Sequence, residues 1–430
     1  MKRSASSLLR TLVRAGTRQS RTVSKLVTAL FTAPAAAKTK RKRKPAAKVA
    51  KPAALAKPAK PAKPVAKPAA PRVRAATTPA VPQVRATTSA ASRVRATATA
   101  TAAPRVRTTP PAAPGTTVGR STIPSAATHV PPSPGKWLAS HYATPTRRMS
   151  YWLYLPNNPP EDTQRKGLPL LVMLHGCHQT ATQFAQGTRM NQWAEQMGYA
   201  VLYPQQLVSV QAQRCWKWYD RATQEGGGDV PTIVGMIGKV MTQYAIDRSR
   251  IYIAGISAGA GMANIIALNH PQLFAAVGLH SGPVFGAGHN TIGALGVMQH
   301  GAATRMDSAA HEVLMRHPQF PGMPAILIQG EGDQVVRPVN QLQLLRQSRL
   351  LNKLSAAPKI THKPQGRGGR HNAHQLHDFY EGRKLLLRVA RIADLEHAWS
   401  GGDPALAFNA KAGPDASKMM LEFFSRHRRT

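Results

Sequence analysis

Acidic residues are scarce in this chain, where 18 Asp and Glu stand against 58 Lys and Arg in 430 residues. The first acidic residue is Glu161, so residues 1–134 hold 27 Lys and Arg with no opposite charge, whereas the remainder holds 31 basic and 18 acidic residues. A stretch this charged, with few large apolar residues, cannot bury enough surface to fold. We therefore predict a disordered basic tail over residues 1–134 and one folded domain over residues 137–430.

Cysteine and long apolar runs are scarce too. Cys177 and Cys215 are the two cysteines of the chain, so one disulfide can form, although composition does not decide whether it does. No apolar run reaches the roughly 18 residues that span a bilayer, which predicts a soluble or peripheral protein without a transmembrane segment. An export signal is only weakly indicated, because the short apolar run 26–31 follows six Lys or Arg residues between Arg3 and Lys25.

The tail has three parts of different composition. Residues 6–31 place apolar residues at three- to four-residue spacing among basic ones, which fits an amphipathic helix or a basic segment without structure. Residues 38–67 are rich in Lys, Ala and Pro, and residues 71–111 repeat units such as PRVRAATT and SRVRATAT. This composition resembles the tails of linker histones and bacterial nucleoid-associated proteins. Such a polycation binds DNA, acidic polysaccharide or an anionic membrane by counterion release, and a solubilising spacer explains it equally well.

Beyond residue 134, strand and helix patterns alternate. Short apolar runs flanked by turn residues predict buried strands, and longer amphipathic segments between or after them predict helices. This alternation is typical of an α/β fold with a mostly parallel sheet and helices on both faces. The predicted strands are 169–174, 199–203, 250–256, 275–280, 325–329 and 385–392, and the helices include 181–197, 230–244 and 415–424.

The strongest chemical signal is the segment Gly255-Ile256-Ser257-Ala258-Gly259, which lies directly between a predicted strand and a predicted helix. This is the G-x-S-x-G nucleophile elbow of the α/β-hydrolase fold in the setting it requires. The sharp turn exposes the serine at the start of a helix, where backbone dipoles favour developing negative charge. Ser257 is therefore the predicted nucleophile.

A serine needs a base and an orienting acid, which follow it along the chain in this fold. Asp333 comes after the strand at 325–329 and is the predicted acid, with Glu331 as the alternative. His397 follows the last predicted strand on a loop rich in glycine and is the predicted base. The oxyanion requires two backbone N–H donors, for which we predict Ala258 and, on the loop after the first long strand, Cys177.

Five motifs in this order carry a family resemblance: LHGCHQT, RCWKWYD, GISAGAGMAN, GEGDQVVRPVN and EHAWSGG. The region from about Trp152 to Phe424 resembles the poly(3-hydroxybutyrate) depolymerase-type esterases, whose relatives include acetyl-xylan and feruloyl esterases. The resemblance implies an exported or extracellular hydrolase that cleaves short-chain hydroxyalkanoate or related esters without a cofactor. It matches Ser257, Asp333 and His397 to the triad. The chain departs from the family pattern at Glu396, where a glycine is common, and in its poor export signal.

The matching motifs also contain both cysteines, so the resemblance implies a disulfide between Cys177 and Cys215 that would fix the oxyanion loop. Trp216 and Trp218 are candidates to line an apolar substrate cleft, or equally to anchor loops in the core. His175 is a further substrate-contact candidate, although a histidine at this place more often orders the loop.

Two other interpretations compete with an esterase. His371, His374, His377 and Asp378 would suit a metal site on a helix, but their glycine-rich flanks favour a hairpin strand, so we predict no metal. The rival is a protein that uses the hydrolase fold only as a scaffold and binds a polyanion or a polyester granule through its tail. The alternative to export is a cytoplasmic location, with the tail on such a granule or polyanion. The intact triad favours the enzyme.

Overall fold

The computed structural model describes residues 134–429 except 146 and 303–305. The predictions for the basic tail, including the amphipathic segment 6–31, lie outside the described residues.

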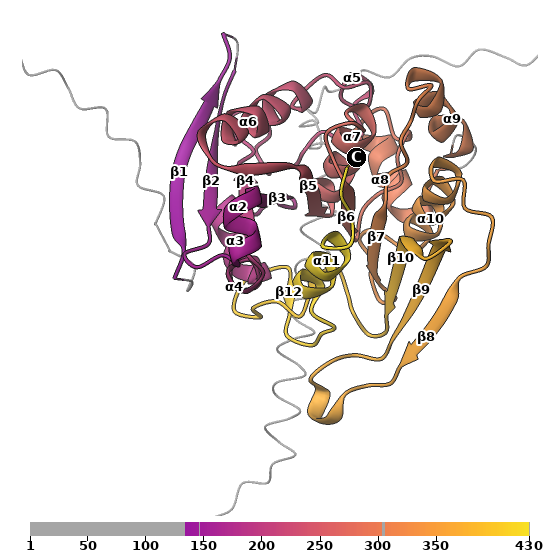
Figure 1. The fold of residues 1–430 in the computed structure, drawn as a ribbon. Coiled ribbons are helices and arrows are strands. Elements are labelled where there is room, and N and C mark those ends of the chain that lie inside the picture. The colour runs from indigo at the N-terminus through magenta and orange to yellow at the C-terminus, as the bar shows by residue number, and fades with distance from the viewer. Residues whose placement is uncertain (1–133, 146, 303–305, 430) are drawn as a thin grey trace, which may run out of the picture. The chain divides into compact units, whose positions relative to one another are not determined.

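The described residues form a ten-stranded sheet in the order β1-β2-β4-β3-β5-β6-β7-β10-β9-β8 (Figure 1). The six strands from β4 to β10 in this order run parallel to their neighbours, and β1, β2, β9 and β8 pair antiparallel at the two sides. The strands are β1 (Lys136–Ala143), β2 (Arg148–Leu155), β3 (Leu168–Leu174), β4 (Ala200–Pro204), β5 (Ile246–Ile256), β6 (Ala276–His280), β7 (Ala325–Gly330), β8 (Lys359–Lys363), β9 (His374–Glu381) and β10 (Lys384–Ile392).

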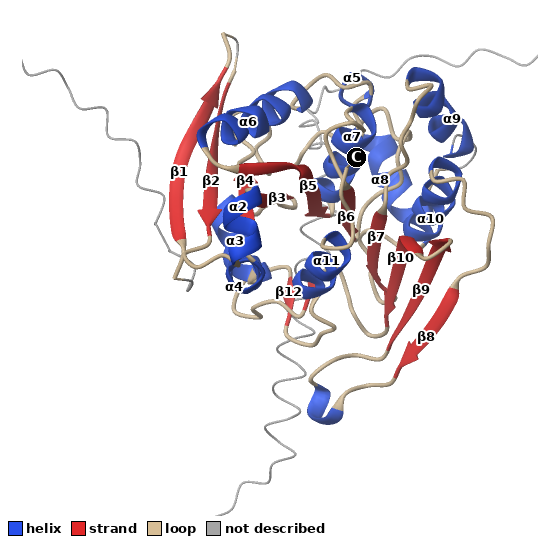
Figure 2. Ribbon diagram, viewed as in Figure 1, coloured by secondary structure: helices blue, strands red, loops and turns tan. Residues whose placement is uncertain are grey.

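Helices cover both faces of this sheet (Figure 2). The helices are α2 (Glu161–Lys166), α3 (Ala181–Thr188), α4 (Met190–Met197), α5 (Arg221–Gln224), α6 (Val230–Gln243), α7 (Ala258–Asn269), α8 (Thr291–His300), α9 (Met306–Arg316), α10 (Val339–Leu351) and α11 (Ala416–Phe424). One apolar core lies between the sheet and α6 to α10, and a second lies between the sheet and α3, α4 and α11. Six consecutive residues of β3 are buried because both faces of a central parallel strand are covered.

The predicted mostly parallel sheet with helices on both faces is confirmed. Each of the six predicted strands is present within a few residues of its expected bounds. The predicted helix 181–197 is instead two helices, because Arg189 adopts a left-handed conformation between α3 and α4. The histidine-containing segment is the hairpin strand β9, as its flanking glycines indicate. Within residues 134–429, no helix is long and apolar enough to cross a bilayer.

Candidate active site

Ser257 lies at the sharp turn between β5 and α7. Its backbone has a φ of 57° and a ψ of −125°, a conformation that costs on the order of 1–3 kcal/mol unless the surroundings enforce it. The Ser257 N–H donates to the carbonyl of His280 on β6 over 3.0 Å, and its carbonyl accepts from the N–H of Gly261. The turn is thus bonded on both sides, which fixes the serine side chain at the carboxyl edge of the sheet.

Two glycines permit this turn. A Cβ at Gly255 would lie 2.5 Å from the carbonyl carbon of Gly259, and a Cβ at Gly259 would lie 2.1 Å from the carbonyl oxygen of Leu174. Both contacts are with backbone, which cannot move aside. Strand β3, strand β5 and helix α7 therefore meet too closely here for any residue larger than glycine.

His397 and Asp333 are joined by a hydrogen bond of 2.8 Å between Nδ1 and Oδ2. Asp333 follows β7, His397 follows β10, and both side chains are buried. The second oxygen of Asp333 accepts from the N–H groups of Val335 and Val336 at 2.9 Å each. These bonds hold the carboxylate in one orientation, so Nδ1 of His397 is occupied and Nε2 is the nitrogen left for the pocket.

The environment of Asp333 favours its charged form. Burial by itself would raise its pKa, but the charge of His397, the hydrogen bond to His397 and the two backbone donors together hold the pKa below its ordinary value of 3.8. Asp333 is therefore an anion at neutral pH. A buried anion beside an imidazole stabilises the imidazolium form of the ring.

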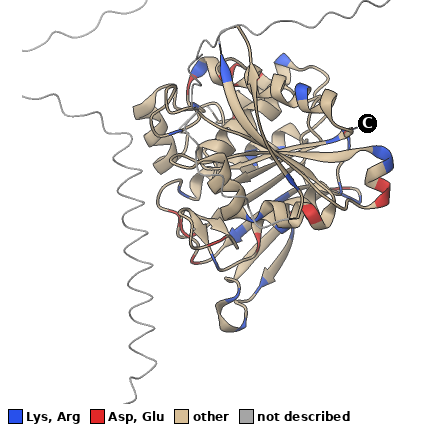
Figure 3. Cartoon of the chain, turned by 90° about the vertical axis from the view of Figure 1, so that its left-hand side faces the viewer, with Lys and Arg blue, Asp and Glu red and all other residues tan. Residues whose placement is uncertain are grey.

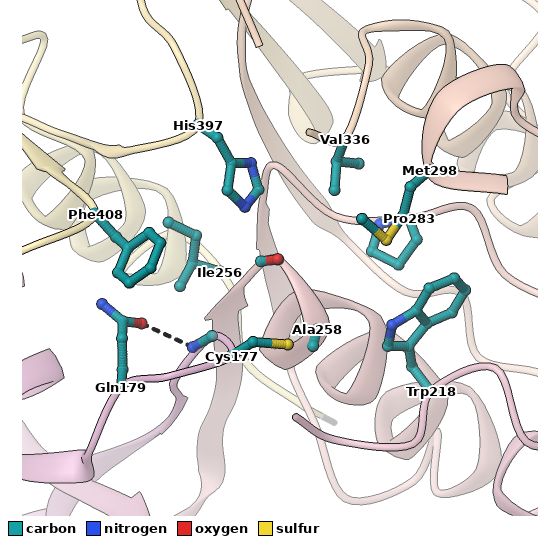
Figure 4. A pocket seen from close by; sticks show the side chains of 12 residues that line it. Cys177, Gln179, Trp218, Ile256, Ala258, Pro283, Met298, Val336, His397 and Phe408 are labelled. Carbon is teal, nitrogen blue, oxygen red and sulfur yellow. Dashed lines mark hydrogen bonds between the residues drawn. The ribbon is translucent and has the colours of Figure 1, made fainter. Parts of the chain in front are cut away.

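Ser257 and His397 line one narrow pocket, together with Ala258 and Cys177. Figure 4 shows His397 and Phe408 on one side of this pocket and Trp218, Met298 and Pro283 on the other. The cavity has a volume of about 20 Å³, which leaves room for little more than one water molecule. No hydrogen bond joins the Ser257 hydroxyl to His397 in the described part of the chain. In structures without substrate, such bonds are often long or poorly aligned.

The comparisons with known proteins bear on this arrangement. The family model "Esterase PHB depolymerase" matches residues 149–367, just over half of the 430 residues. The chain belongs to this family. The resemblance inferred from the motifs is thereby confirmed.

Several curated relatives are similar to this esterase-family chain over part of their length. A probable acetylxylan esterase A of Aspergillus fumigatus is 35% identical over 133 residues, covering 30% of this chain and 34% of the relative. A poly(3-hydroxybutyrate) depolymerase of Ralstonia pickettii is 32% identical over 141 residues, covering 31% and 28%. A poly(3-hydroxyalkanoate) depolymerase C of Paucimonas lemoignei is 25% identical over 225 residues, covering 52% and 53%. The chain spans only about a quarter to a half of these relatives.

Among solved structures, an acetyl xylan esterase from Aspergillus awamori superposes with a TM-score of 0.52 at 19% identity, covering 67% of this chain and 99% of that chain. This likeness confirms the predicted α/β-hydrolase fold.

The loop after β3, which contains the predicted oxyanion donor Cys177, is held in place by a disulfide and by hydrogen bonds. Cys177 and Cys215 form a disulfide, and the His178 N–H donates to the carbonyl of Gln213. The Gly176 N–H donates to Oε1 of Gln179 at 2.8 Å, the bond drawn in Figure 4. The N–H of Cys177 makes no hydrogen bond within the described residues, and Ala258 begins α7, where an N–H has no partner inside the helix. Two unpaired amides are thus available at the serine.

Two of the three substrate-contact candidates are corrected by the structure. His175 is fully buried, with its ring nitrogens near the carbonyl of Gly176 and the N–H of Gln206, and burial lowers its pKa to about 4. Trp216 is fully buried and donates from Nε1 to the carbonyl of His175. Both side chains order the loop and do not line the pocket, whereas Trp218 does line it.

Glu331, the alternative acid, pairs with Arg391 and not with His397. Within residues 134–429, no cluster of three His, Cys, Asp or Glu residues could hold a metal ion. Sequence reasoning missed Phe408, Met298, Pro283 and Val336 as pocket-lining residues, since they come from four separate loops and helices that no local pattern connects.

Proposed function

We propose that this protein is a serine carboxylic-ester hydrolase, with Ser257 as nucleophile, His397 as general base and Asp333 as the orienting acid. The observation that carries the proposal is the hydrogen-bonded Asp333–His397 pair at the pocket that Ser257 lines. Membership of the esterase family and the names of the curated relatives support the same reaction class. The chain covers only part of those relatives, so the activity is inferred for this protein.

The proposed reaction is acyl transfer in two steps. His397 Nε2 takes the proton of Ser257 as the hydroxyl oxygen attacks the ester carbonyl, and the N–H groups of Ala258 and Cys177 donate to the oxyanion. The imidazolium, stabilised by Asp333, protonates the departing alcohol. A water molecule activated by His397 then attacks the acyl-enzyme and releases the acid, which restores Ser257.

The acyl group should be short. The pocket at Ser257 is narrow between Trp218, Met298 and Pro283, which favours a short acyl group there. We propose short-chain hydroxyalkanoate esters, including polyesters, as substrates. The acetyl and feruloyl esters named for several relatives are the alternative; the narrow pocket favours the acetyl group over the larger feruloyl group.

The Ser257→Ala variant tests the reaction. Hydrolysis of 4-nitrophenyl butyrate should fall at least about 10⁴-fold, because the remaining groups cannot supply a nucleophile. Ser355→Ala is the matched control, since Ser355 is exposed and its side chain makes no contact described in the structure. Equal rates for the wild type and Ser257→Ala would remove the enzyme proposal and leave a binding protein built on a hydrolase scaffold.

A panel of substrates separates the two classes of ester. Amorphous polyhydroxybutyrate and acetylated xylan would be compared at equal concentrations of ester groups, with release of hydroxybutyrate or acetate as the readout. Faster cleavage of the polyester would support the first class, and acetate release without polyester cleavage would assign the alternative.

We propose that the basic tail contacts a polyanion, such as DNA or an anionic surface, or a polyester granule. We also propose that the protein is exported from the cell, which membership of the esterase family supports. The proposal for the tail rests on the 27 positive charges of residues 1–134 and on counterion release. Deleting residues 1–134 should abolish salt-sensitive binding to DNA or to granules. Unchanged binding would refute the role of the tail, and detection of the protein only in the cytoplasm would refute export.

A further inference from the structure

A basic arm, defined as residues 359–374, extends the sheet beyond β10. It comprises β8, the short helix η1 (Arg367–Gly369) and the first residue of β9. His374 pairs with Ile392 at the end of β10 and with Lys363 at the end of β8. Ile392 in turn pairs with Gly330 of β7, three residues before Asp333. The turn of the arm therefore leaves the sheet at the same edge as the candidate active site.

Backbone hydrogen bonds tie the arm to the wall of the catalytic pocket. The N–H of Asn372 donates to the carbonyl of Gly413 at 2.8 Å, and the N–H of Gly413 donates to the carbonyl of Arg370 at 3.1 Å. Gly413 follows Phe408 by five residues, with the short strand β12 (Asn409–Ala410) between them. A hollow of about 450 Å³ lies along this junction and is lined by His397, Phe408, Asn372 and Lys411. The arm and the candidate active site are thus joined by one continuous surface.

The charge of the arm is positive and unbalanced. Lys359, Lys363, Arg367 and Arg370 are exposed, and none of them forms an ion pair with another described residue. Two of the nearby carboxylates already have partners, because Asp378 pairs with Arg388 and Glu331 pairs with Arg391. Figure 3 shows Lys and Arg in blue, and no red, at the lower end of the domain where the arm turns.

A second hollow marks the base of the arm. It has a volume of about 320 Å³, and His362, Lys363, His374 and Arg391 contribute to its lining. Glu331 is the one acidic residue there and is paired with Arg391. Lys363 is thus the one Lys or Arg of this lining without an ion pair to another described residue, and positive charge on a concave surface attracts anionic groups more strongly than on a convex one.

Close to His397 the surface carries more negative than positive side chains, unlike the arm. Asp394 and Glu396 line the hollow beside His397, with Lys411 as the single cation. An anionic group would be repelled there and attracted by the arm further along the same surface. A ligand that fits both regions is long, carries its ester on an uncharged unit, and carries negative charges on units some distance away.

We propose that the basic arm binds an anionic polysaccharide, bearing carboxylate or sulfate groups, while an acylated unit of the same polymer occupies the pocket at Ser257. This inference rests on the proposed esterase function and extends it by naming the substrate class. Residues 359–374 contain no Phe, Tyr or Trp, so the arm lacks the large aromatic rings on which successive bases of a nucleic acid stack most strongly, and a nucleic acid is the weaker fit.

The experiment compares three full-length proteins that share the same tail. The arm variant carries Lys363→Gln, Arg367→Gln and Arg370→Gln. The matched control carries Arg165→Gln, Arg248→Gln and Arg426→Gln, three exposed cations without ion pairs among the described residues. They lie at the opposite edge of the sheet from the arm, where the parallel strands begin. Arg165 precedes β3, and Arg248 lies in the first half of β5. Arg426 follows α11, and the N–H of the nearby Arg429 donates to the carbonyl of Ser249 in β5.

Two readouts are used. The first is the affinity at low salt for unacetylated polygalacturonate and, separately, for DNA. The affinity for polygalacturonate should fall about tenfold in the arm variant, as expected for the loss of three exposed charge contacts. The second is acetate release from acetylated polygalacturonate and from the same polymer with its carboxylates amidated. The wild type and the control should prefer the anionic polymer, the arm variant should not, and all three should hydrolyse 4-nitrophenyl butyrate at the same rate.

Each other outcome has a defined meaning. The inference is overturned if the arm variant keeps the affinity and preference of the wild type, if the control loses them equally, or if the arm variant loses affinity for DNA but not for polygalacturonate. Arm-dependent binding of polygalacturonate in a protein that hydrolyses no ester would support the arm as a polysaccharide site and refute the esterase function on which the rest depends.

Discussion

The carboxylate of Asp333 decides which nitrogen of His397 carries the proton. In Asp333→Asn, the amide oxygen can still accept from Val335 and Val336, but the amide N–H₂ then faces Nδ1 of His397. The ring must accept there and hold its proton on Nε2, where it cannot receive one from Ser257. We expect kcat for 4-nitrophenyl butyrate to fall on the order of 10³- to 10⁴-fold.

Glu331→Gln is the control for this substitution. Glu331 lies two residues away and pairs with Arg391 on the surface. Loss of this exposed ion pair costs at most about 1 kcal/mol of stability and leaves the bond between Asp333 and His397 in place. The kcat should therefore stay within about twofold of the wild-type value. A larger loss of kcat in Glu331→Gln than in Asp333→Asn would assign the acid role to Glu331.

The position of a side chain could be predicted where the fold requires certain residues in a fixed order along the chain. Ser257, Asp333 and His397 each follow a strand of the parallel sheet, and the ends of parallel strands meet at one edge, so position along the sequence was sufficient to bring them together. His175 and Trp216 were proposed as substrate contacts because they lie in motifs beside the site. Whether such a side chain points toward the pocket or behind the loop depends on packing, which the motif does not contain.

The oxyanion loop depends on a neighbouring loop for its shape. The Cys177–Cys215 disulfide closes a segment with a sequence separation of 38 residues, and cross-linking a loop of this size stabilises the folded state by up to about 4 kcal/mol. The double variant Cys177→Ala/Cys215→Ala should therefore have a lower free energy of unfolding. Its kcat should also fall, because the N–H of residue 177 would be less well positioned.

Urea unfolding and hydrolysis of 4-nitrophenyl butyrate measure the two effects separately. Reduction of the wild type with dithiothreitol should reproduce both, and it should leave the double variant unchanged. Full activity in a protein with this bond removed would show that hydrogen bonds such as that from Gly176 to Gln179 hold the loop without it.

Whole strands and helices were predictable in the centre of the sheet and less so at its sides. Strands such as β3 are buried on both faces, so their sequence is a continuous apolar run that is easy to identify. At the outer side, β8 reads Lys-Ile-Thr-His-Lys and has one large apolar side chain, which gives no pattern. The break between α3 and α4 was missed because the left-handed residue is Arg189, whereas glycine is the usual signal for that conformation.

The folded domain as a whole should lose stability in mild acid. Burial lowers the pKa of His175 and of His427 to about 4 and that of His280 to about 3, against 6.5 for an unperturbed histidine. Between the pKa of a histidine in the unfolded chain, 6.5, and these lower values in the folded chain, the three histidines bind protons only when the chain unfolds. The free energy of unfolding therefore decreases as the pH falls from about 6.5 toward 4. Asp333 has a lowered pKa, and its contribution is present above pH 3.8 and lost only below it, outside this window.

His427 allows this acid sensitivity to be tested away from the catalytic pocket. Its ring packs on Phe423 with 4.5 Å between centroids, and neither ring nitrogen has a hydrogen-bond partner among the described residues. The charges of Lys384 and Arg426 further lower its pKa. Replacing it by leucine in His427→Leu should remove up to about 3 kcal/mol of the stability difference between pH 7 and pH 4, measured as urea midpoints across this range.

The control is His300→Gln, at an exposed position on α8, which should leave the dependence of stability on pH unchanged. If both variants follow the wild-type curve, the ring of His427 is already accessible to protons in the folded protein, and the acid sensitivity comes from other histidines whose pKa burial lowers, such as His175 and His280.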